Sequence, residues 1–481
     1  MMSRVAQRRA LSTAVPTAVS EHFAGRFALG KNHAPVKLKQ SAKIIRDGHS
    51  MRVLGGACSE VLGGKNLAAV LRAGFELEQR AFAALESGQA AEVLSIHTSV
   101  GVPKQLETFI RALEPHLPTT GDDWCVNLQA EGASAVHAAI DMCLQASGQD
   151  LSAPSAKVGV AVSQTSYHGP PSTSPGGWAP LGSRAKGLTL EAQYPVPTPF
   201  FRARGEGEAA FHARKLTEFE AYLEHHEHEI GVLLIEPQWG SSAAAMPWPP
   251  ALLRAYVAAA KARGIAVISD EIMCGLGRHG QQPPPSGGTG LFLAECWQLD
   301  VDAVTFGKAI GGGAGHLLSG AALLRGASLL QGTAHGTALQ SHTYAAASSR
   351  ALLNGAALLD VIPSYRPDVQ ALGASIGTVL TELGERSGGA MITHGQGAKW
   401  GALFAHVDPR ARDLASARLE ERCVRKGILP YFVPVGGFML TPRYDDDPDD
   451  VAAAVTELAD AALATTREMG WAASDLMTSG R

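Results

Sequence analysis

The sequence lacks the long apolar runs and the excess of positive charge that mark two large classes of protein. No stretch reaches the about 18 uninterrupted apolar residues of a membrane-spanning helix. Its 41 lysines and arginines are outnumbered by 45 aspartates and glutamates, which leaves a formal net charge of −4. Proteins that bind nucleic acids usually carry a basic domain or stripe. We therefore expect neither a membrane nor a nucleic acid among the partners of this chain.

Cysteine is also scarce, with six residues in 481 and no closely spaced pair. The scattered thiols predict neither a disulfide framework nor a zinc site; they are Cys58, Cys125, Cys143, Cys274, Cys296 and Cys423. The histidine-rich stretch 218–230 has no ligand set at a recognisable spacing, which favours a solvated helix over a metal site. Hydrophobic residues, in contrast, make up 46% of the chain, enough for a large core in two or three domains.

The N-terminus contains no acidic residue before Glu21, although Arg4, Arg8 and Arg9 and several hydroxyl side chains precede it. This composition is typical of an organelle-targeting presequence, and "RRALSTA" resembles a mitochondrial processing site. Residues 1–30 are therefore predicted to direct the protein to mitochondria. The alternative is an ordinary basic arm on a cytoplasmic protein.

Short apolar runs alternate with amphipathic helices between about residues 120 and 330. The runs predict strands at 124–128, 158–163, 232–236, 265–269 and 301–306, with helices at 133–145 and 250–263 between them. Because these strands are almost continuously apolar, we expect a parallel sheet that is covered on both faces. Residues 366–481 are predicted to form a separate α+β unit.

Chemically useful residues follow the predicted strands. Ligands bind outside the carboxyl ends of the strands in such a sheet, so we expect these residues to meet at one edge. They are Gly132 and Ala133 at a helix start, Tyr167, Glu236, Asp270 and Lys308. Each also has an ordinary interpretation, as a tight turn, a core aromatic, a helix cap or a surface lysine.

Together these residue types suit one cofactor. A lysine beside an apolar wall is a nucleophilic amine, and a buried acid can hold a protonated pyridine nitrogen. An aromatic ring can stack on a planar cofactor, and a helix amino end free of bulky side chains binds phosphate. The combination points to pyridoxal 5′-phosphate (PLP).

Several motifs resemble the class III aminotransferases, which are fold-type I PLP enzymes. They are "LLIEP", "AVISDEIMCGLGRHG", "DAVTFGKAIGGG", "SYHG", "HTY", "HGQGAKWGALF" and "GGFMLTPRYDDDPDD", within about residues 95–465. The resemblance implies an α/β fold, in which a large domain with a mostly parallel sheet flanked by helices is joined to a smaller α+β domain. Residues 31–110 would join the small domain, 111–365 would form the large PLP-binding domain, and 366–481 the C-terminal small domain.

The resemblance also implies roles for single residues. Lys308 would carry the cofactor as a Schiff base, and Asp270 would keep its ring nitrogen protonated. The other expected cofactor contacts are Ile272 and Tyr167 on the two ring faces, Gly132 and Ala133 at the phosphate, Glu236 of the Ile-Glu-Pro motif, Met273 near the ring hydroxyl, and Thr343. Since the threonine comes from the partner subunit in this family, a homodimer is expected.

Some positions depart from the family pattern. Glu131 and Ser134 replace a serine and a glutamate around Gly132, and a carboxylate beside a phosphate is unfavourable unless it points away. His394 stands where a structural arginine is common, and the usual arginine partner of Glu236 is not evident, although Arg443 follows nearby in "TPRY".

The predicted activity is transfer of an amino group between an amine or amino acid and a keto acid or aldehyde. The alternatives are another PLP reaction on the same scaffold, namely racemisation, aminomutation or decarboxylation, and, more remotely, a non-enzymatic homologue. Met439 occupies the position where many relatives bind a distal substrate carboxylate through arginine, so a donor without that group is expected. Trp239, Met246 and Trp248 either line an apolar entrance or belong to ordinary packing.

Overall fold

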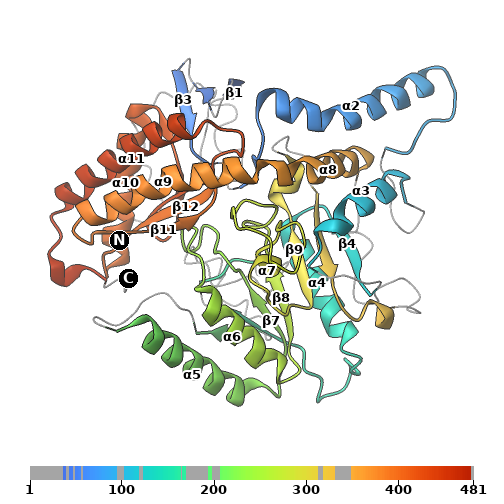
Figure 1. Ribbon diagram of the computed structural model, residues 1–481, viewed down its shortest axis with the longest axis horizontal. Coiled ribbons are helices and arrows are strands. Elements are labelled where there is room, and N and C mark those ends of the chain that lie inside the picture. Colours follow the sequence, from blue (N-terminus) through green and yellow to red (C-terminus); the bar gives the residue numbers. More distant parts are fainter. Residues whose placement is uncertain are drawn as a thin grey trace, which may run out of the picture.

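The computed structural model describes most of the chain (Figure 1). The described residues are 36–39, 43–46, 49–55, 58–94, 102–118, 123–163, 165–169, 193–197, 206–312, 318–330 and 348–477. The predicted targeting segment 1–30 and Thr343 lie outside these ranges, so both stay predictions.

A seven-stranded sheet occupies the centre of the molecule. Its strands, in spatial order, are β4 (Cys125–Gln129), β10 (Ser319–Leu323), β9 (Ala303–Phe306), β8 (Ala266–Asp270), β7 (Ile230–Ile235), β5 (Gly159–Ser163) and β6 (Gln193–Val196). Only β10 runs antiparallel to its two neighbours. The mostly parallel sheet that the sequence predicts is therefore confirmed, with strand ends shifted by one or two residues and with β6 and β10 as additions.

Helices cover both faces of this sheet, because alternate strand residues point to opposite sides. Val232 and Leu234 of β7 pack in one cluster with α4 (Gly132–Ala146). Leu233 and Ile235 point the other way, into the cluster that contains the buried residues of α6 (Pro250–Lys261). α5 (Glu208–His226) packs against α6 on that side (Figure 1).

The C-terminal part builds a second, antiparallel sheet. Its strand order is β11 (Met391–Gln396), β12 (Lys399–Phe404), β15 (Gly437–Leu440) and β14 (Tyr431–Val433). The helices of this part are α9 (Arg366–Arg386), α10 (Pro409–Lys426) and α11 (Pro448–Met469), which lie together in Figure 1. Strands and helices are thus both present, as expected of an α+β unit.

The segment before residue 111 is divided between the two parts. Its strands β1 (Val36–Lys39), β2 (Lys43–Arg46) and β3 (His49–Val53) form a small sheet that is completed by β13 (Ile428–Leu429) from the C-terminal part. Its helices α2 (Gly64–Glu86) and α3 (Gln105–Leu113) instead pack on α8 (Ser349–Val361), which precedes residue 366 (Figure 1). The predicted domain boundaries therefore stay a prediction.

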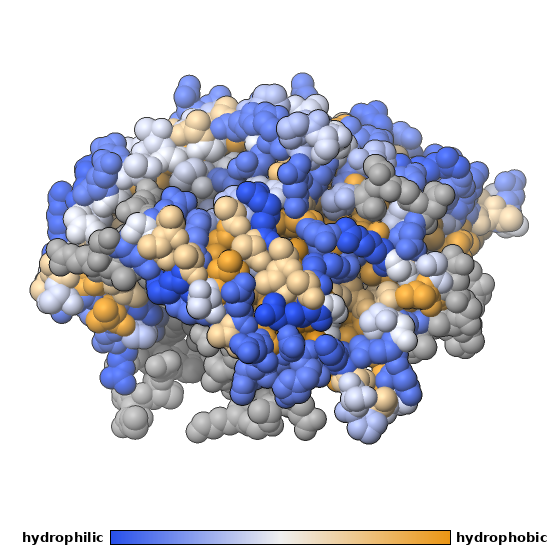
Figure 2. Space-filling model, turned by 60° about the horizontal axis from the view of Figure 1, so that its bottom comes forward, coloured by the Kyte–Doolittle hydropathy of each residue, from blue (hydrophilic) through white to orange (hydrophobic). Residues whose placement is uncertain are grey.

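The molecular surface agrees with the composition. Among the described residues, none of the helices combines the length and the apolar character that crossing a membrane takes. Figure 2, in which the bottom of the molecule comes forward, shows mostly hydrophilic residues around a smaller apolar area near the centre of that face.

Arg278 joins three parts of the chain at one point. Its guanidinium is fully buried and donates to the carbonyl oxygens of Glu60 at 2.7 Å, Pro442 at 2.9 Å and Ala398 at 3.3 Å. The guanidinium carbon also lies 5.0 Å from the ring centre of Tyr444. One side chain thus links the N-terminal segment, the large sheet and the C-terminal sheet.

Replacing Arg278 by methionine should lower the midpoint of thermal unfolding by about 5 °C or more, because several buried carbonyls would lose their donor. Differential scanning calorimetry measures this midpoint. Arg386→Met is the matched control, since the Arg386 side chain is 46% exposed and pairs with Glu382 on the surface of α9. Equal midpoints for the two variants would contradict a joining role for Arg278.

Candidate active site

Three neighbouring parallel strands end beside one another at the centre of the sheet. β8 ends at Asp270, Glu236 directly follows β7, and Lys308 comes two residues after β9. Because the order is β9, β8, β7, the structure brings these side chains to the same edge. The sequence predicted this meeting from strand polarity alone.

Asp270 is buried and held by donors on both oxygens. Oδ1 accepts from the backbone N–H of Ile272 and the hydroxyl of Thr305, each at 3.1 Å. Oδ2 lies 2.7 Å from Nδ1 of the buried His168. These contacts fix the direction of the carboxylate and supply the hydrogen bonds that a buried anion needs.

His168 and Thr305 are site residues that the sequence reasoning missed. His168 follows Tyr167 directly in the "SYHG" motif, and Thr305 pairs with Asp270 in the β8–β9 ladder. The contact of Thr305 with Asp270 could have been predicted from the register of β8 and β9, but only once these strands were known to be neighbours.

Lys308 lies in a strained and partly buried position. It begins a short 3₁₀ turn (Lys308–Gly311) with a φ of 39°, in the left-handed region where a side chain costs about 1–3 kcal/mol. Burial lowers the pKa of its amine, while Cys58 and Asp270 oppose that shift. A lysine with a lowered pKa is neutral, and so nucleophilic, at a lower pH than an exposed one.

Glu236 is buried behind these groups and bonds to backbone rather than to arginine. It accepts from the N–H of Tyr167 at 3.0 Å and from that of Gly240 at 3.1 Å. Burial raises its pKa. The sulfur of Met273 crowds Gly240, which leaves no space for a Cβ atom there.

A buried lysine lies near Glu236, and its positive charge opposes the rise in the Glu236 pKa. Lys399 is fully buried on β12, and its ammonium donates to the carbonyl of Gln238 at 3.1 Å. The Arg443 backbone N–H donates to Asp446 at 2.8 Å, and its guanidinium lies beside Gly63. His394 bonds through Nε2 to the carbonyl of Ala244 at 2.8 Å.

The amino end of α4 opens toward the same site. A Cβ atom on Gly132 would come within 2.8 Å of Ile272, so only glycine allows this close approach. The N–H of Ala133 does not point into open space, because it donates to the carboxylate of Glu131 at 3.1 Å. The carboxylate of Glu131 thus lies at the helix end where the resemblance places a phosphate, which is the unfavourable arrangement that the sequence raised.

The described geometry agrees with a comparison of sequences. A profile of the aminotransferase class-III family matches residues 69–429. The chain belongs to the class III aminotransferases.

Curated relatives match only part of the length of this class III aminotransferase. The acetylornithine aminotransferase of Xylella fastidiosa (strain Temecula1) is 32% identical over 197 residues, which cover 40% of this chain and 43% of that protein. The chain therefore spans less than half the length of this curated relative.

Solved structures cover far more of the class III aminotransferase. An (S)-enantioselective omega-transaminase from Thermomicrobium roseum aligns over 97% of this chain and 99% of its own, with a TM-score of 0.74 and 19% identity. The PMP-bound aminotransferase from Vibrio fluvialis aligns over 96% and 99%, with a TM-score of 0.72 and 18% identity. These likenesses confirm the predicted fold-type I architecture.

The cofactor of class III aminotransferases is PLP, and the described residues fit it. The nucleophilic lysine, the buried carboxylate and a helix start without a Cβ atom are the donor set that its aldehyde, ring nitrogen and phosphate require. Ile272 is buried between Gly132 and Gly307, and Tyr167 is 42% exposed at the surface of the site. At the phosphate end, the Glu131 carboxylate is the group that would have to move.

Two other expectations for the class III aminotransferase concern apolar residues. Trp239 and Trp248 are buried and stack with their ring centres 5.0 Å apart, so the packing interpretation is right and the entrance interpretation is wrong for them. Met439 is fully buried on β15, in a cluster with Cys58, Leu403 and other apolar residues.

Cysteines and histidines do not gather into a candidate metal site in the described part of this class III aminotransferase. All six cysteines are free. The histidine-rich stretch forms the end of α5, and no group of three or more potential ligands occurs among the described residues.

Proposed function

We propose that the protein is a PLP-dependent transaminase that moves an amino group between an amine or amino acid and a keto acid or aldehyde. The observation that carries this proposal is that Lys308, whose pKa is lowered by burial, follows the strand next to the one that ends at the buried and donor-held Asp270. A non-enzymatic homologue would have no reason to retain both a strained lysine and an oriented buried acid.

In this proposal Lys308 acts on the substrate carbon and Asp270 on the ring nitrogen of the cofactor. The Lys308 amine would hold the cofactor at rest and, when free, would take a proton from the amine-bearing carbon of the substrate as general base and return it as general acid. Bound PLP supplies the electron withdrawal that makes that carbon acidic. Asp270 would keep the ring nitrogen protonated, and His168 and Thr305 hold Asp270 in place.

The remaining residues position the cofactor. Ile272 and Tyr167 would flank the ring, while Gly132 and Ala133 would meet the phosphate. Glu236 holds the backbone of Tyr167, and Met273 would pack near the ring hydroxyl. Thr343 of a second subunit is proposed to add a phosphate contact.

A half-reaction tests transamination against its alternatives. An amine donor added without acceptor should convert the cofactor stoichiometrically to its amino form, so the visible absorbance band of the PLP form should disappear. A racemase would return to the starting spectrum with scrambled donor, and a decarboxylase would release carbon dioxide. A keto acid should then restore the first spectrum, and failure to do so would contradict the proposal.

The donor is proposed to lack a distal carboxylate. The position of Met439 offers a thioether inside an apolar cluster, and a carboxylate buried there would be without a charged partner. Neutral or aromatic amines should therefore have a kcat/KM about tenfold or more above that of 4-aminobutyrate or ornithine of similar length. A clear preference for 4-aminobutyrate that survives Met439→Ala would mean that another cation binds the carboxylate.

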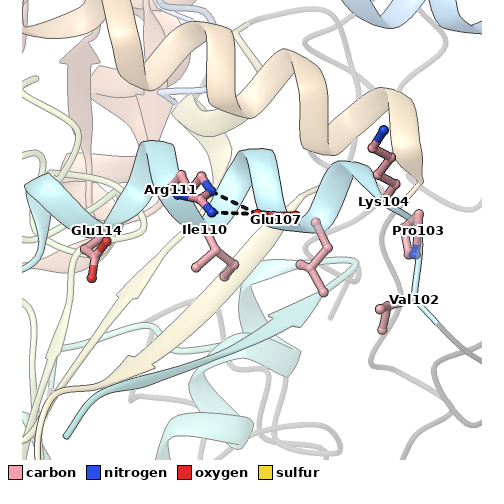
Figure 3. Close-up of a pocket in the computed structure, with 8 residues that line it drawn as sticks. Val102, Pro103, Lys104, Glu107, Ile110, Arg111 and Glu114 are labelled. Atoms are coloured by element: carbon pink, nitrogen blue, oxygen red, sulfur yellow. Dashed lines mark hydrogen bonds and ion pairs between the residues drawn. The ribbon is translucent and has the colours of Figure 1, made fainter. Parts of the chain in front are cut away.

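We also propose a homodimer, for which exposed apolar side chains provide support. On α2, Phe75 is 52% exposed, Phe82 65% and Leu85 61%, and their spacing places them on one face of the helix. A groove of about 550 Å³ runs along α3, where Val102 and Ile110 border it beside the Glu107–Arg111 pair (Figure 3). Exposed apolar side chains gathered on one helix face are typical of association sites.

Replacing both Phe75 and Phe82 by glutamate should convert dimer to monomer at micromolar concentration, because two charges would face an apolar partner surface. Sedimentation velocity measures the change. Leu414→Glu on α10 alters an apolar residue that is 41% exposed elsewhere and should leave the dimer intact. A monomeric and fully active wild-type protein would refute both the dimer and the contact from Thr343.

The basic N-terminus supports a further proposal, that residues 1–30 direct the protein to mitochondria. Fusion of these residues to a fluorescent protein should give mitochondrial fluorescence, and Arg4, Arg8 and Arg9 replaced by glutamine should abolish it. Diffuse fluorescence of the unmodified fusion would favour the cytoplasmic alternative.

A further inference from the structure

We propose that Glu131 competes with the phosphate of the cofactor for the amino end of α4 and thereby weakens cofactor binding. The inference rests on the proposed function, because it takes Gly132 and Ala133 as the phosphate position. A glycine-rich helix start without a neighbouring carboxylate would not show this competition.

The carboxylate of Glu131 occupies the donors that a phosphate would use. Oε2 accepts from the N–H of Ala133 at 3.1 Å, and Oε1 accepts from the N–H of Ser134 at 2.9 Å. The hydroxyl of Ser134 donates to the same Oε1 at 2.5 Å. An anion of the chain itself thus satisfies two free N–H groups in the first turn of the helix, and such groups bind phosphate at helix amino ends.

Independent contacts place this carboxylate at the candidate active site. Gly132, the next residue, lies against Ile272, which in turn approaches Gly307, the neighbour of Lys308. Burial raises the pKa of Tyr167, and the negative charge of Glu131 raises it further, so the two side chains are near each other. Glu131 is an exposed residue, so its side chain can leave the helix end without disturbing the core.

Two anions cannot accept from the same N–H groups, so phosphate binding requires the carboxylate to move. While the Glu131 carboxylate accepts from these N–H groups, it competes well with free cofactor, because a group tethered to the chain has a high effective concentration. After it moves, it remains a negative charge close to the phosphate. Both effects weaken binding of a phosphorylated cofactor, and neither acts on a cofactor without the phosphate.

The test compares two ligands on the full-length apoprotein, PLP and its dephosphorylated form, pyridoxal. Glu131→Ser retains a side chain that caps helices well but removes the carboxylate. We expect this variant to bind PLP about tenfold more tightly than the wild type, with an unchanged affinity for pyridoxal. Titration of the visible absorbance measures both affinities.

Glu224→Ser is the matched control, because it removes one exposed carboxylate on α5, away from the site. It should leave both affinities unchanged. Inorganic phosphate supplies a second readout, since it should raise the thermal unfolding midpoint of the Glu131→Ser apoprotein more than that of the wild type.

An unchanged or weaker PLP affinity in Glu131→Ser, or an equal gain for pyridoxal, would overturn the competition. Borohydride reduction followed by peptide mapping separates this outcome from a failure of the proposed function. Cofactor attached to Lys308 would leave the proposed active site standing even if Glu131 had no effect. Attachment elsewhere would remove the basis of both.

Discussion

Replacement of Lys308 by alanine should abolish the covalent link to the cofactor and lower kcat by at least about 10³-fold. The variant has no amine that can attack the aldehyde, and it also loses the group that moves the proton in the proposed mechanism. The 3₁₀ turn at Lys308–Gly311 should still form, because its bonds are made by the backbone.

The link can be followed directly by borohydride reduction and mass spectrometry of the intact chain. Wild-type protein should gain the mass of the reduced cofactor, and Lys308→Ala should not. Lys261→Ala is a suitable control, because Lys261 is partly buried and pairs with Asp302 at the far end of the sheet. Mass retained in Lys308→Ala would place the attachment at another lysine and end the assignment.

Asp270→Asn should keep the fold and much of the bound cofactor but reduce kcat by about 10²–10⁴-fold. An asparagine oxygen can still accept from the Ile272 N–H and the Thr305 hydroxyl, so the local structure has its partners. The amide cannot stabilise a positive charge on the ring nitrogen, and the cofactor then withdraws electrons less effectively.

Single-turnover spectroscopy with an amine donor separates this loss from weaker cofactor binding. The half-reaction should be slow even when the variant is saturated with cofactor. Asp300→Asn removes an exposed carboxylate that pairs with Arg325 and should react at the wild-type rate. A near-normal half-reaction in Asp270→Asn would mean that another acid performs this task.

The central strands could be predicted from the sequence because they are buried on both faces. The runs that became β7 and β8 are almost continuously apolar and end at recognisable polar residues. Strand β10 was missed, since four of its five residues are small and a glycine-rich stretch of sequence precedes it. Its place between β4 and β9 is decided by long-range pairing, which leaves no local pattern.

The residues of the candidate site could likewise be predicted only in part. Asp270 and Lys308 could be identified from strand polarity, because the carboxyl ends of parallel strands meet at one edge. The burial of Lys399 could not, since a lysine in "AKWGALF" is indistinguishable from an exposed strand residue until β12 packs beside Gln238. The contact between Glu131 and α4 depends on a side-chain rotamer, which the sequence leaves open.

The pairing of β3 with β13 has a consequence for the order in which the chain can fold. Arg52 and Val53 of β3 lie opposite Ile428 and Leu429, so about three quarters of the chain separates the two partners. During synthesis the small N-terminal sheet must wait for its fourth strand until residue 429 has left the ribosome. Until then β3 presents an unpaired edge, and any chain that stops before β13 keeps that edge open to other strands.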